Sequence, residues 1–393
     1  MSEWKEYRFS EFVDINPSVK LTGRDKYSFV EMKDLQNGNK FCIPDSERIF
    51  SSGTKFQDGD TLFARITPCL ENGKICQVKR LKDRIGFGST EFLVFRGKKG
   101  ISDNDFVFYL ARWNEVRDFA ENHFEGTSGR QRVPKNCFEN LYLKLPEYKE
   151  QTAIVSTLSS LDDKIDLLHR HNKTLEAMAE TLFRQWFVEE AEESWVVGRL
   201  GDILESIESG SRPKGGIDPE LKTGIPSIGA ESINGLGFYD YSKTKYITEE
   251  FYKNMKRGLI KNYDVLIYKD GAYIGRKGMF ANGFPFERCV VNEHVFILRS
   301  NLKSNQIYLY FMLQQSELEQ LNANSAQPGL NQESIKSLEI ILHSKEKIDK
   351  FEQVTKGWID KIFINCNQIR TLTQLRDTLL PKLMSGEVRV KLD

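Results

Sequence analysis

The stretch QTAIVSTLSSLDDKIDLLHRHNKTLEAMAETLFRQWF, residues 151–187, decides how this chain is organised. At alternating spacings of four and three residues it carries an apolar seam interrupted by one asparagine: Ile154, Leu158, Leu161, Ile165, Leu168, Asn172, Leu175, Ala179, Leu182 and Trp186. A 3.5-residue repeat keeps such a seam on one side of a helix, where a partner helix covers it. The stretch therefore predicts a coiled-coil helix of roughly 55 Å. The alternative is a long core helix inside one globular domain.

A second copy of this seam lies 197 residues further along the chain. The segment LDDKI at 161–165 resembles WIDKI at 358–362, and two Thr-Leu pairs recur at the same offset. The second seam consists of Phe351, Thr355, Trp358, Ile362, Asn365, Ile369, Leu372, Arg376 and Leu379. Proline lacks a backbone N–H, so Pro381 is expected to end or kink this second helix.

Each long helix follows a β-rich region. In residues 1–147, short runs of β-forming residues are separated by turn pairs such as Asn37-Gly38 and Asp58-Gly59. Residues 195–342 echo them: the segment 292–296 resembles 90–94 at an offset of 202. The sequence thus predicts globular region 1 (1–147), a spacer helix (148–188), globular region 2 (195–342), and a second spacer helix with the C-terminal tail (343–393).

The order of these parts predicts the fold. The first helix leads from one globular region into the other, and the second helix needs a partner for its seam. We therefore expect an α+β (mixed α/β) fold in which two similar β-rich regions lie at opposite ends of an antiparallel two-helix coiled coil. A pseudo-two-fold axis near residues 170 and 367 would pair Asn172 with Asn365. Two buried asparagines that bond each other penalise every slipped register, so this pair is expected to set the helix alignment.

Composition excludes several classes of protein. The chain has 393 residues and a formal net charge of zero, and it contains no apolar run of 18 residues. Its N-terminus is charged, which predicts a cytoplasmic protein without a membrane partner. Six scattered cysteines without a C-x-x-C pair predict no metal site. No phosphate-binding loop or dinucleotide fingerprint is present, so we expect no catalytic residues; a stand-alone nuclease or methyltransferase would need them.

Basic and aromatic side chains gather in the loops of both globular regions. Residues 253–277 hold seven basic residues against two acidic ones, with Tyr268 and Tyr273 between them. Arg, Gln and Asn can bond base edges, while Lys and Arg neutralise phosphates. A solvated charged face is the alternative, but two similar regions on a spacer favour a long, split DNA target. The expected DNA contacts are Arg65, Lys74, Arg130, Gln131, Arg132, Lys269, Tyr273, Arg276, Lys277, Gln327 and Asn331.

Further stretches carry a family resemblance: LKLPEYKEQ (143–151), residues 195–210, QPGLN (327–331) and LPKLMSGE (380–387). With the duplicated layout, they resemble the specificity (S) subunit of type I restriction–modification systems over nearly the whole chain. Glu147 stands where that family often has a second proline.

The resemblance implies a non-catalytic subunit that reads a bipartite double-stranded DNA target, one half-site per globular region. It implies two methyltransferase (M) subunits as partners, and restriction (R) subunits bound through them. Cofactors are expected on the partners alone: S-adenosylmethionine, and ATP with Mg. The alternative is a coiled-coil scaffold that binds protein without DNA specificity.

Overall fold

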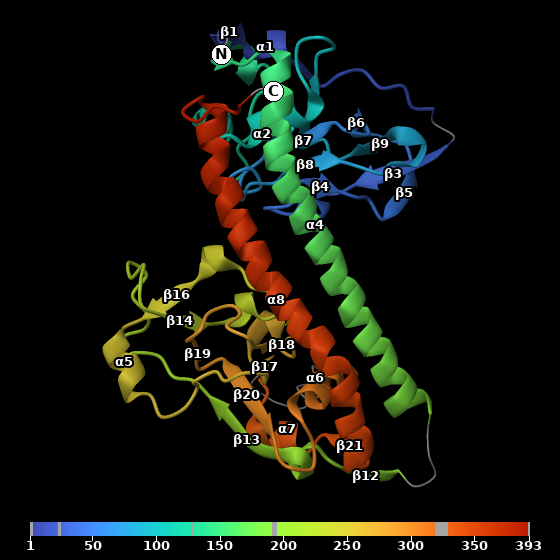
Figure 1. Cartoon of the computed structure of the whole chain (residues 1–393), viewed down its shortest axis with the longest axis vertical. Helices are drawn as coiled ribbons and strands as arrows, with labels where there is room; N and C mark the ends of the chain where they lie inside the picture. Colours follow the sequence, from blue (N-terminus) through green and yellow to red (C-terminus); the bar gives the residue numbers. More distant parts are fainter. Residues whose placement is uncertain (1–2, 23–24, 128, 191–194, 319–328, 392–393) are drawn as a thin grey trace. The chain divides into compact units, whose positions relative to one another are not determined.

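A computed structural model describes residues 3–22, 25–127, 129–190, 195–318 and 329–391. Its long helices are α4 (Tyr148–Arg184), which continues as a π-helical turn (Gln185–Glu189), and α8 (Lys345–Met384). The chain divides into two compact units, and each unit combines one globular region with segments of both long helices (Figure 1). Unit 1 comprises residues 1–166 and 371–393, and unit 2 comprises residues 167–370.

Unit 1 is built on a five-stranded sheet of order β2-β10-β7-β8-β4. A four-stranded sheet of order β5-β3-β9-β6 and the pair β1-β11 complete its strands. The strands are β1 (Lys5–Arg8), β2 (Val13–Ile15), β3 (Lys26–Val30), β4 (Phe41–Cys42), β5 (Ser46–Ile49), β6 (Thr54–Gln57), β7 (Thr61–Ala64), β8 (Ile75–Val78), β9 (Ile85–Gly88), β10 (Phe92–Gly97) and β11 (Tyr142–Leu145). The shorter helices are α1 (Phe9–Phe12), α2 (Asn104–Arg112) and α3 (Asn114–Asn122). One apolar core joins α2 and the five-stranded sheet to Ile154 and Leu158 of α4 and Leu383 of α8.

Unit 2 repeats this sheet with the order β13-β20-β17-β18-β15. In both five-stranded sheets the first three neighbouring pairs are antiparallel and the last pair is parallel. A sheet of order β16-β14-β19 and the pair β12-β21 accompany it. The strands are β12 (Val196–Arg199), β13 (Leu204–Ser209), β14 (Ile225–Ile228), β15 (Gly235–Leu236), β16 (Lys245–Ile247), β17 (Asp264–Tyr268), β18 (Lys277–Phe280), β19 (Val290–Val291), β20 (Val295–Ser300) and β21 (Glu339–Leu342). The shorter helices are α5 (Glu249–Asn254), α6 (Gln306–Gln314) and α7 (Gln332–Lys336). The predicted mixed fold with two similar β-rich regions is confirmed.

Within each unit, the segments of α4 and α8 run antiparallel (Figure 1). In unit 2, Asn172 contacts Asn365 and Phe183 packs on Phe351 with ring centroids 5.6 Å apart. The helix segments of unit 1 are also antiparallel. Near the start of α4, Glu150 bonds Arg389, which follows α8, and further along α4, Asp162 bonds Arg376, which is earlier in the chain than Arg389. The expectation that Pro381 ends the second helix is wrong, since α8 continues to Met384. A proline in the final turn removes only one backbone bond near the helix end.

The seam of unit 2 contains the asparagine contact that the helix alignment predicts. Nδ2 of Asn365 donates to Oδ1 of Asn172 over 2.8 Å, and Nδ2 of Asn172 lies 3.4 Å from Sγ of Cys366. Asn365 is fully buried. An unpaired amide at this position would lose about 1–3 kcal/mol of solvation. Whether the pair sets the helix register stays a prediction.

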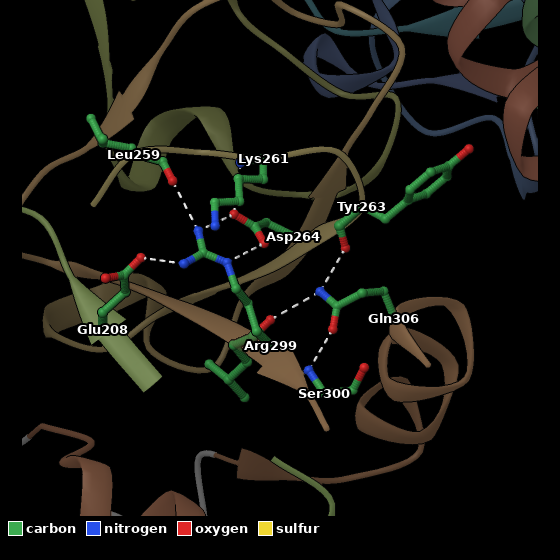
Figure 2. Close-up of polar contacts among 9 residues, drawn as sticks. Glu208, Leu259, Lys261, Tyr263, Asp264, Arg299, Ser300 and Gln306 are labelled. Carbon is green, nitrogen blue, oxygen red and sulfur yellow. Dashed lines mark hydrogen bonds and ion pairs between the residues drawn. The ribbon is translucent and has the colours of Figure 1, made fainter. Parts of the chain in front are cut away.

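A buried ion pair holds the central strand of each five-stranded sheet. In unit 2, Arg299 of β20 bonds both carboxylate oxygens of Asp264 in β17, over 2.8 and 2.6 Å (Figure 2). The guanidinium also reaches Glu208 at 2.6 Å and the carbonyl of Leu259 at 2.9 Å. In addition, Asp264 accepts the backbone N–H of Lys261 over 2.8 Å. Every nitrogen of the guanidinium is therefore bonded, which a charge in this position requires.

Unit 1 contains the same kind of buried Asp–Arg ion pair, and we call each of these two ion pairs a clasp. Arg96 of β10 bonds both carboxylate oxygens of Asp60 at 2.7 Å, and Asp60 accepts the N–H of Gln57 at 2.8 Å. Burial raises the pKa of Asp60 and of Asp264, whereas the two arginines act in the opposite direction. The clasp fixes the start of β7 or β17, and the far end of the same strand carries the candidate site.

Removing one partner of a clasp should destabilise its unit strongly. We expect Arg299→Met to lower the free energy of unfolding by about 3–5 kcal/mol, because the buried Asp264 carboxylate loses its counter-ion. Urea unfolding measures the change. The control is Arg288→Met, whose ion pair with Glu249 is about half exposed and should contribute less than about 1 kcal/mol. Equal losses in the two variants would contradict this role for the clasp.

Candidate nucleic-acid interface

In unit 1 the candidate site lies where the central strand β7 ends. Arg65 follows β7, and its carbonyl accepts the N–H of Val133 over 2.7 Å. Two residues further on, the N–H of Thr67 donates to the carbonyl of Gln131 over 3.0 Å. The loop before β11 is thereby fastened to the strand end. It brings Arg65 together with two predicted residues that are far from it in sequence, Gln131 and Arg132.

Arg132 is held in place by an acidic partner. Its Nε and Nη2 lie 2.8–2.9 Å from the carboxylate oxygens of Glu91, which precedes β10. Glu91 raises the pKa of Arg132 through this hydrogen-bonded ion pair. Nη1 of Arg132 donates to the carbonyl of Arg130 over 3.1 Å, and the side chain remains 43% exposed. Arg130 is exposed on the same loop.

Unit 2 builds the same site at the end of β17. The N–H of Lys269 donates to the carbonyl of His294, and the carbonyl of Lys269 accepts the N–H of Leu330. In unit 1, Arg65 has the corresponding partners, since its N–H donates to the carbonyl of Glu91. Lys269 and Arg65 therefore occupy equivalent places. The ammonium of Lys269 lies 5.2 Å from the Phe296 ring and 3.8 Å from Asp270.

A turn after β17 presents the predicted aromatic and arginine side chains. Gly271 and Gly275 take positive φ angles of 66° and 81°, which glycine adopts at low cost. The turn places the Arg276 guanidinium 3.9 Å from the centre of the Tyr273 ring. Tyr273 is 45% exposed. This stacked pair offers an accessible cation and a flat apolar face, and both chemistries bind nucleic acid.

The side chains of other predicted residues form hydrogen bonds within the protein. Lys74 donates to the carbonyl of Met32, and Lys277 to the carbonyl of Ser316, each over 2.7 Å. Asn331 caps α7, because its side chain accepts the N–H of Ser334 over 2.8 Å. The predicted residue Gln327 lies outside the described residues. Local contacts thus already occupy polar groups of Lys74, Lys277 and Asn331.

A polar cluster beside Lys269 escaped the sequence-based prediction. Nδ1 of His294 lies 2.8 Å from Oδ2 of Asp270, and its Nε2 lies 3.3 Å from Glu293. Nε of Arg212, from the loop after β13, lies 3.1 Å from Glu293. Sequence similarity aligns Glu293 with Glu91. The backbone hydrogen bonds show instead that His294 is the equivalent of Glu91, because the carbonyl of His294 accepts the N–H of Lys269 as the carbonyl of Glu91 accepts that of Arg65. Within the described ranges, no three His, Cys, Asp or Glu side chains are grouped to bind a metal ion.

Comparisons with known proteins agree with this arrangement. A family model for the type I restriction modification DNA specificity domain matches residues 1–177 and 192–374. The MjaIX specificity subunit of Methanocaldococcus jannaschii is 27% identical over 73% of this chain and 70% of its own length. The HindI specificity subunit of Haemophilus influenzae is 25% identical over 99% of this chain and 100% of its own.

A solved S subunit of a type I restriction–modification system from M. genitalium has the same fold. Its TM-score is 0.59 at 16% identity, and the match covers 97% of this chain and 96% of that one. The chain belongs to the family of type I restriction–modification specificity subunits. It is a DNA-specificity protein and a non-catalytic subunit. No helix among the described residues has the apolar length that a membrane span requires.

The two loop arginines of unit 1 should differ in their effect on stability. We expect Arg132→Ala to lower the thermal midpoint by no more than about 4 °C, because Glu91 loses a half-exposed partner. Arg130→Ala removes an exposed side chain and should leave the midpoint unchanged. Differential scanning calorimetry of the full chain measures both. A larger shift for Arg130→Ala than for Arg132→Ala would contradict the assignment.

Proposed function

We propose that the chain reads a bipartite target in double-stranded DNA, with one half-site for each globular region. The observation that carries this proposal is the repetition of one strand-end site, in which Arg65 and Lys269 have the same backbone partners. The side chains around the two sites differ: Arg132 and Glu91 in unit 1, His294 and Asp270 in unit 2. The same frame thus presents two sets of donors and acceptors, which suits two different half-sites.

We also propose that the chain carries two M subunits, and R subunits through them. On this proposal the chain needs no cofactor of its own: S-adenosylmethionine belongs to the M subunits, and ATP with Mg to the R subunits. A groove along the helix pair of unit 2 supports a protein partner. It is lined by apolar side chains that include Met178, Leu182 and Trp358, and Met178 is 44% exposed. Apolar grooves beside helices commonly receive a helix of another protein.

The asparagine pair is proposed to set the register of the two long helices. A seam of apolar residues alone can slip by a heptad, whereas Asn172 and Asn365 bond each other in one register only. We propose that this pair fixes the helix alignment and, through it, the distance between the two half-sites.

Exchange of one globular region tests the proposed function. A methylation-free host would express the chain with its M partner, and N6-methyladenine would be mapped across the genome. Replacing residues 195–342 by the same region of a relative should change one half of the methylated motif and leave the other half intact. The physical reason is that each sheet and its strand-end site form within one unit.

Two controls complete the exchange experiment. Arg288→Gln changes an exposed ion pair with Glu249, neither member of which bonds a residue of the strand-end site among the described residues, and should leave the motif unaltered. The M subunit alone should methylate no split motif. A change in both half-sites would contradict the proposal. Methylation that does not depend on this chain would favour a scaffold without DNA specificity.

A further inference from the structure

The contact between globular region 1 and the helix pair is charged and fully buried. Asp162 of α4 and Arg376 of α8 form an ion pair at 2.7 Å, with side chains 1% and 2% exposed. Globular region 1 bonds both members: the Tyr109 hydroxyl donates to Asp162 over 2.6 Å, and Arg376 donates to the carbonyl of Gly38 over 2.6 Å. We call the set Tyr109, Asp162 and Arg376 the charged joint.

A second contact extends the charged joint. The ammonium of Lys40 donates to the hydroxyl of Ser159 in α4 over 2.8 Å, and it lies 2.9 Å from Asp105 of α2. The Lys40 side chain is 4% exposed. Burial and the nearby Asp162 carboxylate raise the pKa of the Tyr109 hydroxyl, which stays protonated and donates. A buried ion pair is tolerated when further hydrogen bonds satisfy it. Here globular region 1 supplies two of them, and Asp377 of α8 accepts a third from Nε of Arg376 over 2.9 Å.

The repeat places different residues at the same positions of unit 2. At the helix offset of 197, Asp162 corresponds to Ile359 and Arg376 corresponds to Ala179. Helices α2 and α6 both have nine residues, and their N-caps are Asp103 and Asn305. Counted from these caps, Tyr109 corresponds to Phe311, which lacks the hydroxyl.

These counterparts form a joint of opposite character. Phe311, Ile359 and Ala179 are 2%, 1% and 0% exposed and belong to one apolar core, and we call them the apolar joint. The offset also places Lys356 where unit 1 has Ser159. Tyr109, Asp162 and Arg376 thus each have an apolar counterpart, whereas the Ser159 hydroxyl has the charged Lys356 as its counterpart.

We propose that the two joints are position keys, so that each globular region fits only its own segments of the helix pair. Globular region 1 against Ile359 and Ala179 would bury the Tyr109 hydroxyl without an acceptor and bring Lys40 towards Lys356. Globular region 2 against Asp162 and Arg376 would leave that pair without the bonds from Tyr109 and Gly38. Either mismatch buries unsatisfied polar groups, so the chain holds each region in one place.

A thermodynamic cycle on the full chain tests the key without DNA. We expect Tyr109→Phe to lower the thermal midpoint by roughly 3–10 °C in the wild-type background, because Asp162 loses a buried hydrogen bond. In the Asp162→Ile/Arg376→Ala background the same substitution should cost much less, since the hydroxyl then keeps only the Ser159 hydroxyl, 3.3 Å away, as a partner. Asp162→Asn, which nearly preserves the side-chain volume, provides a second background in which the loss should shrink. The same loss from Tyr109→Phe in all backgrounds would overturn the proposal.

The matched control makes the same chemical change in unit 2. Tyr308 is buried in α6, and its hydroxyl lies 2.7 Å from Nδ1 of His343, outside either joint. Tyr308→Phe should shift the midpoint by the same amount in the wild-type and Asp162→Ile/Arg376→Ala backgrounds. If the shift from Tyr308→Phe differed between the two backgrounds, the helix substitutions would have caused a general loss of structure, and the proposal would be overturned.

A duplication tests the key directly. Residues 195–342 would be replaced by a second copy of residues 1–147, with the helices either unchanged or carrying Ala179→Arg, Lys356→Ser and Ile359→Asp. We expect cooperative unfolding of both units only with the three helix substitutions. Cooperative unfolding without them, or its absence with them, would overturn the proposal. Because calorimetry needs no DNA, its result is separate from a failure of the proposed function, which appears in the methylated motif.

Discussion

The fold depends on one constraint: two long helices share a seam that must hold a single register. Apolar side chains alone permit a slip of one heptad, because every heptad offers similar knobs and holes. In unit 2 the amide of the fully buried Asn365 is bonded by Asn172 in the observed alignment, and we expect this bond to penalise a slipped register. Packing that involves both helices, such as Phe183 on Phe351, follows from this alignment.

The two units divide their residues between a shared frame and differing contacts. The ion pairs Asp60–Arg96 and Asp264–Arg299 are the same in both, and each holds the start of the central strand. Beyond the end of that strand the units differ: Arg132 bonds Glu91 in one, and His294 lies against Asp270 in the other. The ion pairs within the sheets are thus repeated in the two units. The side chains at the strand-end sites and those that contact the long helices differ between the units.

Much of the fold could be predicted from sequence, because heptad spacing fixes the apolar face of a helix and the repeat fixes the symmetry. The contact of Asn172 with Asn365 followed from those two facts. The candidate binding site was harder to predict from the sequence. Sequence similarity aligned Glu91 with Glu293, and strand pairing shifted the match to His294, because backbone bonds set register whatever the side chains are. Carbonyl partners of Lys74 and Lys277 come from distant segments, so periodicity could not indicate them.

The most direct test maps the methylated motif for the wild-type chain and for Asn172→Leu combined with Asp162→Ile and Arg376→Ala, because the buried Asp162–Arg376 pair also joins the two helices; each chain is expressed with the M partner. The wild type should give one split motif with one spacer length. The variant should keep both half-sites and add spacers that differ by about three base pairs, because a heptad slip moves a helix by roughly 10 Å. A continuous motif, or a variant that loses stability while its spacer stays unique, would contradict the account.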